Sequence, residues 1–279
     1  MLFRSIAAVV IGIYALPETP RASHPFDITS ALLSALTFGS LIVFLDALSR
    51  DTAPLLLAGE LAFAVASGVV LCRRQFLMPS PLLPVDLLRI PMFALSVGTS
   101  ICSFVAQTLA FIAIPFHLEA IGYSAVDTGL LMTPWLIATA IFAPISGKLS
   151  DRYPAGLLGL IGLIAFGAGL SALALLSAQH GIWDVAWRMA LAGAGFGLYQ
   201  SPNNRTMQAS APRRRSGGAS GMQAMARLLG QTVGAAFTAF AFARFVDGGV
   251  AAVWLAAMFA LLGALVSAAR LRDFPKPEE

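Results

Sequence analysis

Long apolar runs separated by short polar breaks dominate the chain. A transmembrane helix needs about 20 mostly apolar residues to cross a bilayer. Eight runs of this kind are predicted, at residues 28–48, 53–72, 92–115, 126–146, 156–177, 184–204, 217–243 and 250–269. Residues 1–16 form a shorter apolar run, which we interpret as a partial span. The pattern therefore predicts an all-α, polytopic transmembrane helical bundle of about 8–9 spans.

The composition of the 279 residues agrees with a membrane protein. Hydrophobic residues make up 58% and charged residues 11%, and the mean hydropathy is +0.80. Soluble domains carry roughly a quarter charged residues, so the charged side chains here are too few to coat a soluble globule of this size. The two cysteines and three histidines are scattered, which predicts no disulfide framework, no metal site and no cofactor.

The basic residues are distributed unevenly over the connections between spans. If the eight spans alternate in direction, thirteen basic residues fall in one set of connections and two, Arg50 and Arg244, in the opposite set. Lys and Arg gather on the cytoplasmic side of membrane proteins. We therefore expect a multi-pass protein of the plasma (inner) membrane with a cytoplasmic C-terminus. The net charge of +4 reports this topology, so the lipid bilayer is the expected partner and nucleic acid is not.

A short charged turn after the fourth predicted span carries a candidate conformational gate. Gly147 permits close helix approach, Asp151 can lie near a helix N-terminus, and Arg152 can pair with a neighbouring acid, while Lys148 completes the set of gate-loop residues. The turn resembles the G-x-L-a-D-r loop of the major facilitator superfamily, which follows the second of six spans in that family's second half. The chain departs from the family pattern after Arg152, where the basic tail of the motif is missing.

Further segments resemble the fourteen-span drug:proton antiporters of the EmrB/QacA type within that superfamily. Residues 81–89 resemble the amphipathic segment before their seventh core span, residues 114–124 their outer loop, and residues 211–221 the approach to their penultimate span. The resemblance implies the C-terminal half of a facilitator fold plus two accessory spans. It also implies that roughly the first five to six spans are lacking, so that a missing N-terminal half is an expected partner.

The resemblance also implies a division of the chain and a function. The parts are a partial span (1–16), a cytoplasmic loop (17–27), an accessory helix pair (28–72), a cytoplasmic amphipathic linker (73–91), a six-span C-terminal bundle (92–270) and a cytoplasmic tail (271–279). The implied function is transmembrane transport, namely multidrug efflux of lipophilic small molecules by proton antiport. Because facilitators rock two six-span halves around a midplane site, a chain with one half is expected not to transport alone.

Two other classes of function remain as alternatives. One is a non-transporting membrane partner or pseudo-transporter, which follows from the expected lack of one half. The other is a membrane-embedded enzyme. We disfavour the enzyme because no Ser/His/Asp set, pair of acids or histidine cluster falls near one membrane depth.

Polar and aromatic side chains at helical spacing mark a candidate substrate cavity. Polar groups flanked by aromatic rings suit lipophilic and often cationic compounds, and hydrogen bonding between helices is the alternative. The residues near the end of the sixth predicted span either line the inner mouth of the cavity or cap the helix. The cavity candidates are Ser103, Phe104, Gln107, Thr108, Phe111, Gln200, Asn203, Asn204 and Arg227.

One acidic residue and one glycine-rich segment complete the set of candidates. Glu60 lies inside a predicted span. An intramembrane carboxylate is expensive and functional by default, so Glu60 is the proton-coupling candidate, with packing inside the accessory pair as the alternative. Residues 193–197 alternate glycine with other residues. No strand precedes them, so we interpret them as a close helix contact and not as a nucleotide-binding loop.

Overall fold

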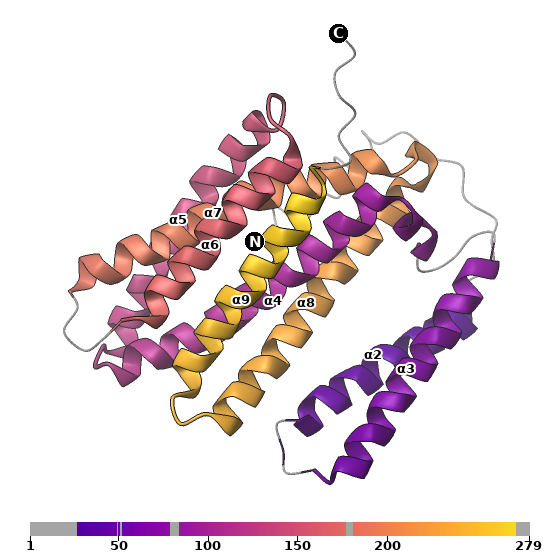
Figure 1. Ribbon diagram of the computed structural model, residues 1–279, viewed down its shortest axis with the longest axis horizontal. Coiled ribbons are helices and arrows are strands. Elements are labelled where there is room, and N and C mark those ends of the chain that lie inside the picture. Colours follow the sequence, from indigo (N-terminus) through magenta and orange to yellow (C-terminus); the bar gives the residue numbers. More distant parts are fainter. Residues whose placement is uncertain (1–26, 49, 51, 79–83, 177–180, 272–279) are drawn as a thin grey trace, which may run out of the picture.

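The computed structural model describes residues 27–48, 50, 52–78, 84–176 and 181–271 (Figure 1). Within these ranges the chain is helical and contains no strand, so the predicted all-α fold is confirmed. The long helices are α2 (Ile28–Leu48), α3 (Pro54–Leu77), α4 (Pro91–Ala120), α5 (Ala125–Leu149), α6 (Ala155–Ala174), α7 (Ile182–Ser210), α8 (Ser216–Arg244) and α9 (Gly248–Ala269). Two short 3₁₀ turns, η1 (Val85–Arg89) and η2 (Arg213–Arg215), precede α4 and α8. The predicted partial span at 1–16 lies outside the described residues.

Six of the described helices are long and apolar enough to cross a membrane, by length and composition alone. They are α2, α3, α4, α5, α6 and α9. The helices α7 and α8 have 29 residues each, which exceeds the length that a bilayer requires. Their polar side chains, Asn203 and Arg227 among them, dilute the apolar character of both helices.

The helices α4 to α9 form one bundle, and the α2–α3 hairpin lies beside it (Figure 1). In the bundle, α7 packs against both α5 and α6, α9 packs between α4 and α6, and α8 packs on α4. The hairpin meets the bundle where α2 contacts α8 and where α3 contacts η1. The structure thus separates a six-helix unit from a helix pair.

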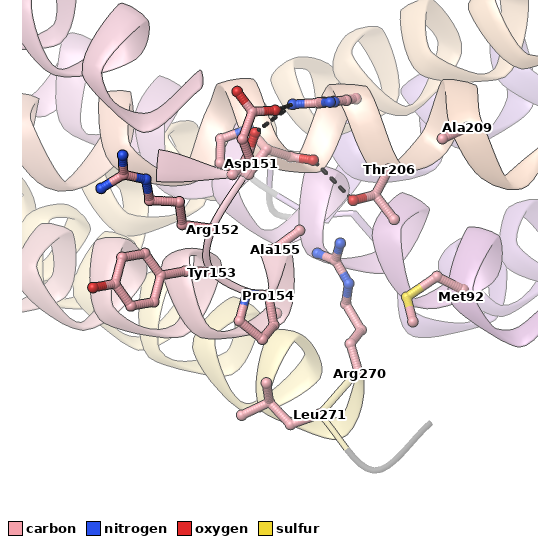
Figure 2. A pocket seen from close by; sticks show the side chains of 14 residues that line it. Met92, Asp151, Arg152, Tyr153, Pro154, Ala155, Thr206, Ala209, Arg270 and Leu271 are labelled. Carbon is pink, nitrogen blue, oxygen red and sulfur yellow. Dashed lines mark hydrogen bonds and ion pairs between the residues drawn. The ribbon is translucent and has the colours of Figure 1, made fainter. Parts of the chain in front are cut away.

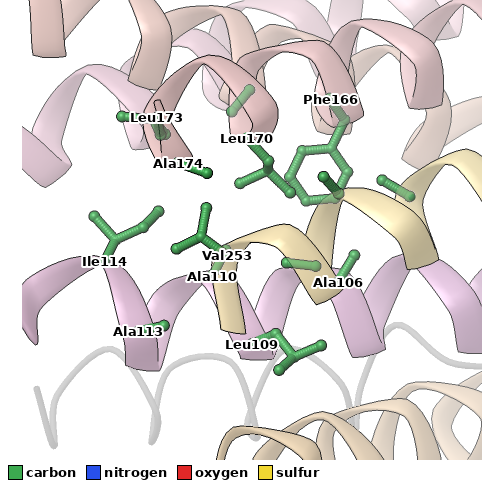
Figure 3. Packing of buried hydrophobic residues seen from close by; sticks show 14 of the residues in the cluster. Ala106, Leu109, Ala110, Ala113, Ile114, Phe166, Leu170, Leu173, Ala174 and Val253 are labelled. Carbon is green, nitrogen blue, oxygen red and sulfur yellow. The ribbon is translucent and has the colours of Figure 1, made fainter. Parts of the chain in front are cut away.

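Buried aliphatic and small side chains fill the centre of the bundle (Figure 3). Ala106, Ala110 and Ile114 on α4 are fully buried, as are Phe166 on α6 and Val253 on α9. Since the three helices meet along this line, α4, α6 and α9 form the packed interior of the bundle. The alanines keep the helix axes close, and the larger residues fill the remaining volume.

Glycines allow backbone to meet backbone along α7. A side chain added at Gly195 would place its Cβ 2.9 Å from Cα of Phe166 on α6, and one at Gly197 would lie 2.9 Å from the carbonyl oxygen of Thr139 on α5. Real Cβ atoms do not tolerate such approaches. The glycine-rich segment 193–197 is therefore a close contact between helices, as the sequence indicates.

Three helices run further than the apolar pattern predicts. α3 ends at Leu77 instead of residue 72, α4 ends at Ala120 instead of 115, and α7 ends at Ser210 instead of 204. α4 continues through Pro115 until the turn at Gly122, whose φ of 104° suits glycine. Hydropathy marks where apolar character stops, whereas a helix stops where its backbone hydrogen bonds stop. The start of the predicted linker 73–91 is therefore helical.

We use the term motif end for the end of the bundle where α5, α7 and α9 finish and α4, α6 and α8 begin. Cationic side chains concentrate there. Asp86 in η1 pairs with Arg215 in η2 at 2.6 Å, and the Arg89 guanidinium lies 4.9 Å from the ring centroid of Phe76 on α3. Arg188, paired with Asp184 at 3.0 Å, lies at the opposite end near the start of α7.

Candidate gate and polar network at the motif end

The α5–α6 connection contacts α7 through the predicted gate residues. Asp151 accepts a hydrogen bond from Arg205 on α7, and Arg205 also donates to the Ser150 hydroxyl at 3.0 Å. A Cβ added at Gly147 would lie 3.3 Å from the Ser201 hydroxyl of α7, so a glycine permits the close approach of α5 to α7. The structure therefore brings two of the predicted gate residues, Gly147 and Asp151, against one helix.

The other two gate residues, Lys148 and Arg152, do not contact α7 in this way. Arg152 is exposed and lines a hollow beside the connection. The Arg205 and Asp151 side chains are 60% and 61% exposed, and ion pairs this exposed contribute about 0–1 kcal/mol. A contact of this strength can form and break without unfolding the helices, which suits a reversible latch.

Behind the Asp151–Arg205 pair lies a buried polar network that joins α9, α7 and α4. Arg270 follows the last residue of α9, is 1% exposed, and donates from Nη1 to Oδ1 of Asn203 on α7 at 2.8 Å. Asn203 in turn donates from Nδ2 to the Ser100 hydroxyl at 2.9 Å and to the Ser96 carbonyl at 3.2 Å, both on α4. Asn203 is therefore the hub where the three helices meet.

Two more contacts extend this network along α7 and α9. The Ser103 hydroxyl of α4 donates to the phenolic oxygen of Tyr199 on α7. The Ser267 hydroxyl of α9 donates to the Gly156 carbonyl of α6 at 3.0 Å. Gly159 also faces Ser267 so closely that a side chain there would collide with it. The start of α6 thus lets the end of α9 approach and so positions Arg270.

Arg270 is only partly satisfied in this network. Its Nε and Nη2 atoms are buried without a hydrogen-bond partner among the described residues. Burial lowers the pKa of Arg270 to about 10, which still leaves the guanidinium charged at neutral pH. A buried cation with unpaired donors is costly to maintain. An anionic group beside Arg270 would therefore supply the hydrogen-bond acceptors that this buried cation lacks.

A hollow of about 810 Å³ opens next to this network (Figure 2). Its wall comes from the α5–α6 connection, the first turns of α4 and α6, the last turns of α7 and the end of α9. Figure 2 shows the Arg270 guanidinium reaching from α9 to the space between Ala155 and Thr206. The lining residues are Met92, Ser150, Asp151, Arg152, Tyr153, Pro154, Ala155, Gly156, Pro202, Arg205, Thr206, Ala209, Arg270 and Leu271.

The cavity candidates on α4 differ in how far their side chains are buried. Ser103 and Phe104 are buried, and the Phe104 ring packs edge-to-face on Phe196 of α7 with centroids 5.9 Å apart. Phe111 is half-buried, with its ring 4.9 Å from that of Trp135 on α5. Gln107 and Thr108 are half-buried. Ser103 thus takes part in hydrogen bonding between helices, the alternative that the sequence leaves open.

The remaining candidates lie on three other helices. Asn203 is buried in the network described above, and Gln200 and Asn204 are half-buried on either side of it. Arg227 is exposed on α8. Glu60 is half-buried on α3, and its Oε2 atom is buried without a partner in the described part of the chain. The structure therefore brings Asn203 to the motif end and leaves Glu60 on the separate helix pair.

Sequence reasoning misses the roles of Arg205, Arg270 and Tyr199. The two arginines count there only as cytoplasmic charges, and no pattern marks Tyr199. Arg205 stands beside Asn203 and Asn204 at the polar end of the predicted span, and this polar cluster is the signal that could have pointed to hydrogen-bond partners. For Arg270 no comparable signal exists, because its burial depends on the two glycines at the start of α6.

Comparison with known proteins shows which family the chain belongs to. The profile of the Major Facilitator Superfamily matches residues 2–235. The chain belongs to the major facilitator superfamily. Its members are membrane transporters, so the superfamily assignment places the chain among transporters and not among enzymes. The matched residues include the gate loop, the helices α2 to α7 and most of α8, and α9 lies beyond them.

Three relatives of this facilitator chain are informative. The uncharacterized transporter YebQ of Escherichia coli is 50% identical over 274 residues, which cover 94% of this chain and 60% of YebQ. The multidrug efflux pump LfrA of Mycolicibacterium smegmatis is 26% identical over 83% of this chain and 47% of its own length. The riboflavin transporter RibZ of Clostridioides difficile is 26% identical over 86% of this chain and 52% of its own length. The chain thus spans about half to three fifths of the length of these relatives.

Proposed function

We propose that this facilitator chain takes part in multidrug efflux by proton antiport, as a member of the fourteen-span EmrB/QacA type. The observation that carries the proposal is the helix pair α2–α3 beside the six-helix bundle α4–α9, the arrangement that the fourteen-span resemblance implies. The similarity to a relative named as a multidrug efflux pump supports the same direction. The substrates under this proposal are lipophilic small molecules, exchanged for protons.

In this proposal the bundle α4–α9 is one half of a two-half transport unit. Facilitators move substrate by rocking two six-helix halves around a site at the bilayer midplane. The second half would supply the opposing wall of the cavity. The Asp151–Arg205 pair would then act as a latch that favours one of the two arrangements, because it links the α5–α6 connection to α7.

The proposed orientation places the motif end in the cytoplasm. Lys148, Arg152 and Arg205 lie there, together with the arginines of η2 and Arg270. Positive charge marks the cytoplasmic side of membrane proteins. The C-terminal end of α9 would accordingly face the cytoplasm, and the turn between α8 and α9 would face outward.

The proposed cavity and proton sites rest on exposure and chemistry. Arg227 is exposed on α8, so it is free to face a second half and a bound substrate. Gln107, Thr108 and Phe111 are half-buried on α4 and combine polar and aromatic groups. Glu60 is the proposed proton carrier, because it is an acidic residue within a helix long and apolar enough to span a membrane, and its Oε2 atom is buried without a partner among the described residues.

A relative named as a riboflavin transporter is as similar to this chain as the multidrug pump is. Transport of a single flavin-like compound is therefore the second candidate function. The two candidates differ in breadth of substrate: a multidrug pump exports several unrelated lipophilic cations, whereas the second candidate moves riboflavin alone.

The proposal is tested by dye transport in everted membrane vesicles. The chain is expressed alone and, separately, fused behind the part of YebQ that it does not cover. We expect the fusion to move ethidium and a second unrelated dye when a proton gradient is imposed, and the chain alone to move neither. Arg227→Ala in the fusion should impair dye movement without loss of membrane insertion. Movement of riboflavin with neither dye would favour the second candidate, and transport insensitive to collapse of the gradient would refute antiport.

A further inference from the structure

The hollow at the motif end has the charge of an anion site. Three arginines, Arg152, Arg205 and Arg270, are among the residues that line it, together with one acidic residue, Asp151. The carboxylate is already paired with Arg205. The wall of the hollow therefore carries an excess of two positive charges, which a doubly charged anion would neutralise.

Arg270 supplies the strongest sign of a missing ligand. The side chain is 1% exposed, yet Nε and Nη2 lack hydrogen-bond partners within the described ranges. These two atoms carry three N–H groups, and a guanidinium presents them in a planar fork. Figure 2 shows the Arg270 guanidinium between Ala155 and Thr206, two other residues that line the hollow. An unsatisfied buried arginine facing a hollow calls for an acceptor with several oxygens.

Two helix starts add to the positive character of the same hollow. Met92, in the first turn of α4, and Ala155 and Gly156, in the first turn of α6, line it. Neither helix start has a side-chain cap hydrogen bond. The N-terminus of a helix carries partial positive charge and free backbone N–H groups, and both favour phosphate groups.

We propose that this hollow binds a phosphate group, with the Arg270 guanidinium as its principal ligand and Arg205 as a second positive charge in the lining. A small turn of the guanidinium toward the hollow brings Nε and Nη2 onto two phosphate oxygens. The phosphate joins the end of α9 to the α5–α6 connection and so strengthens the side of the bundle that carries the latch. Its source is either free phosphate or the headgroup of a phosphatidic acid molecule, since the hollow lies beside apolar residues such as Leu271.

The test measures thermal unfolding of the whole chain purified in detergent. In one arm inorganic phosphate replaces chloride at matched ionic strength. In the other arm mixed micelles contain phosphatidic acid in place of phosphatidylcholine. A ligand that binds the folded state at a hundredfold excess over its Kd should raise Tm by about 5 °C. A rise in the first arm identifies free phosphate and a rise in the second alone identifies a lipid headgroup, whereas no rise in either arm overturns the proposal.

Two variants separate this site from a general salt effect. Arg270→Gln keeps a donor for Asn203 but removes the fork, so its apparent Kd should weaken by at least about tenfold. The matched control is Arg213→Gln, which removes one exposed positive charge from η2 outside the hollow and should respond as the unsubstituted chain does. An unchanged response of Arg270→Gln would overturn the proposal.

A third variant keeps Arg270 in place and so guards against misfolding of the first. Ala155→Glu puts a carboxylate in the first turn of α6, within the space that Arg270 faces. We expect this variant to have a higher Tm than the parent without phosphate and to lose the response to phosphate. A full phosphate response in Ala155→Glu would contradict the site. These measurements need no transport activity, so their outcome is independent of the outcome of the dye-transport test of efflux.

Discussion

The carboxylate of Asp151, in the turn between α5 and α6, accepts a hydrogen bond from the guanidinium of Arg205 near the end of α7. Both side chains are about three fifths exposed, so we expect Asp151→Asn and Arg205→Gln each to lower the free energy of unfolding by at most about 1 kcal/mol. Thermal unfolding of the two single variants and the double variant measures the coupling. A coupling well above this value would mean that the pair is a structural bridge and not a reversible latch.

Asn203 should be far more sensitive than the exposed pair. Asn203→Ala removes the acceptor for Arg270 and the donor to Ser100, which leaves buried polar groups unpaired at a cost of about 1–3 kcal/mol. The expected fall in Tm is several degrees, measured in detergent. Asn204→Ala, one residue further on and half-buried, is the matched control and should change Tm by much less. Equal effects of the two substitutions would remove the hub role of Asn203.

Two glycine substitutions should have opposite effects on stability, because only one of the two glycines lies where α7 closely approaches α6. Gly195→Ala would bring Cβ within 2.9 Å of Cα of Phe166, and overpacking of this kind costs about 1–3 kcal/mol. Gly129→Ala on α5 meets nothing within 4 Å, so the gain in helix propensity should stabilise by about 0.5–1 kcal/mol. Thermal unfolding of both variants checks the sign, and a stable Gly195→Ala would contradict the contact.

The proposed orientation is tested by labelling single cysteines in intact cells. Cys72 and Cys102 are first replaced by alanine. Val246, in the α8–α9 turn, and Arg213, in η2, are both exposed and lie at opposite ends of α8. An impermeant maleimide should label Val246→Cys in intact cells and label Arg213→Cys only after permeabilisation. The reverse pattern would place the motif end outside.

Glu60 can be tested as the proton carrier in the fusion described above. Glu60→Gln keeps the shape of the side chain but cannot ionise, so proton-driven dye movement should fall at least about tenfold, the range that loss of a proton-transfer group commonly produces. Glu119→Gln, at the exposed end of α4, is the control and should leave movement unchanged. Unaltered transport in Glu60→Gln would return that residue to a packing role.

The helices could be predicted from the sequence because apolar runs as long as a bilayer is thick rarely occur outside transmembrane helices. Their ends could not. Residues 73–77 contain two arginines and a glutamine yet remain in α3, and Pro115 lies inside α4 although proline often ends a helix. In both places the helix continues past the apolar boundary, so composition does not show where it stops.

The candidate site could be predicted only where it is formed by residues that lie close together in the sequence. The turn with Gly147 and Asp151 is a short motif. Its residues lie close together in the sequence, and they contact the same helix, α7. Arg270 lies 67 residues from its partner Asn203 and depends on Gly156 and Gly159 for its place. Such long-range burial has no signature in the spacing of residues along one helix. The sequence therefore marked the turn with Gly147 and Asp151 as a candidate gate, but it predicted neither the Arg205 partner of Asp151 nor the buried Arg270.

The glycine contacts along α7 have a mechanical consequence. Where backbone meets backbone at Gly195 and Gly197, no side chain can change rotamer to absorb a displacement. A displacement of this part of α7 is therefore passed directly to α6 at Gly195 and to α5 at Gly197. α5, α6 and α7 should therefore tilt together at these contacts, so that a displacement of any one of them moves the other two.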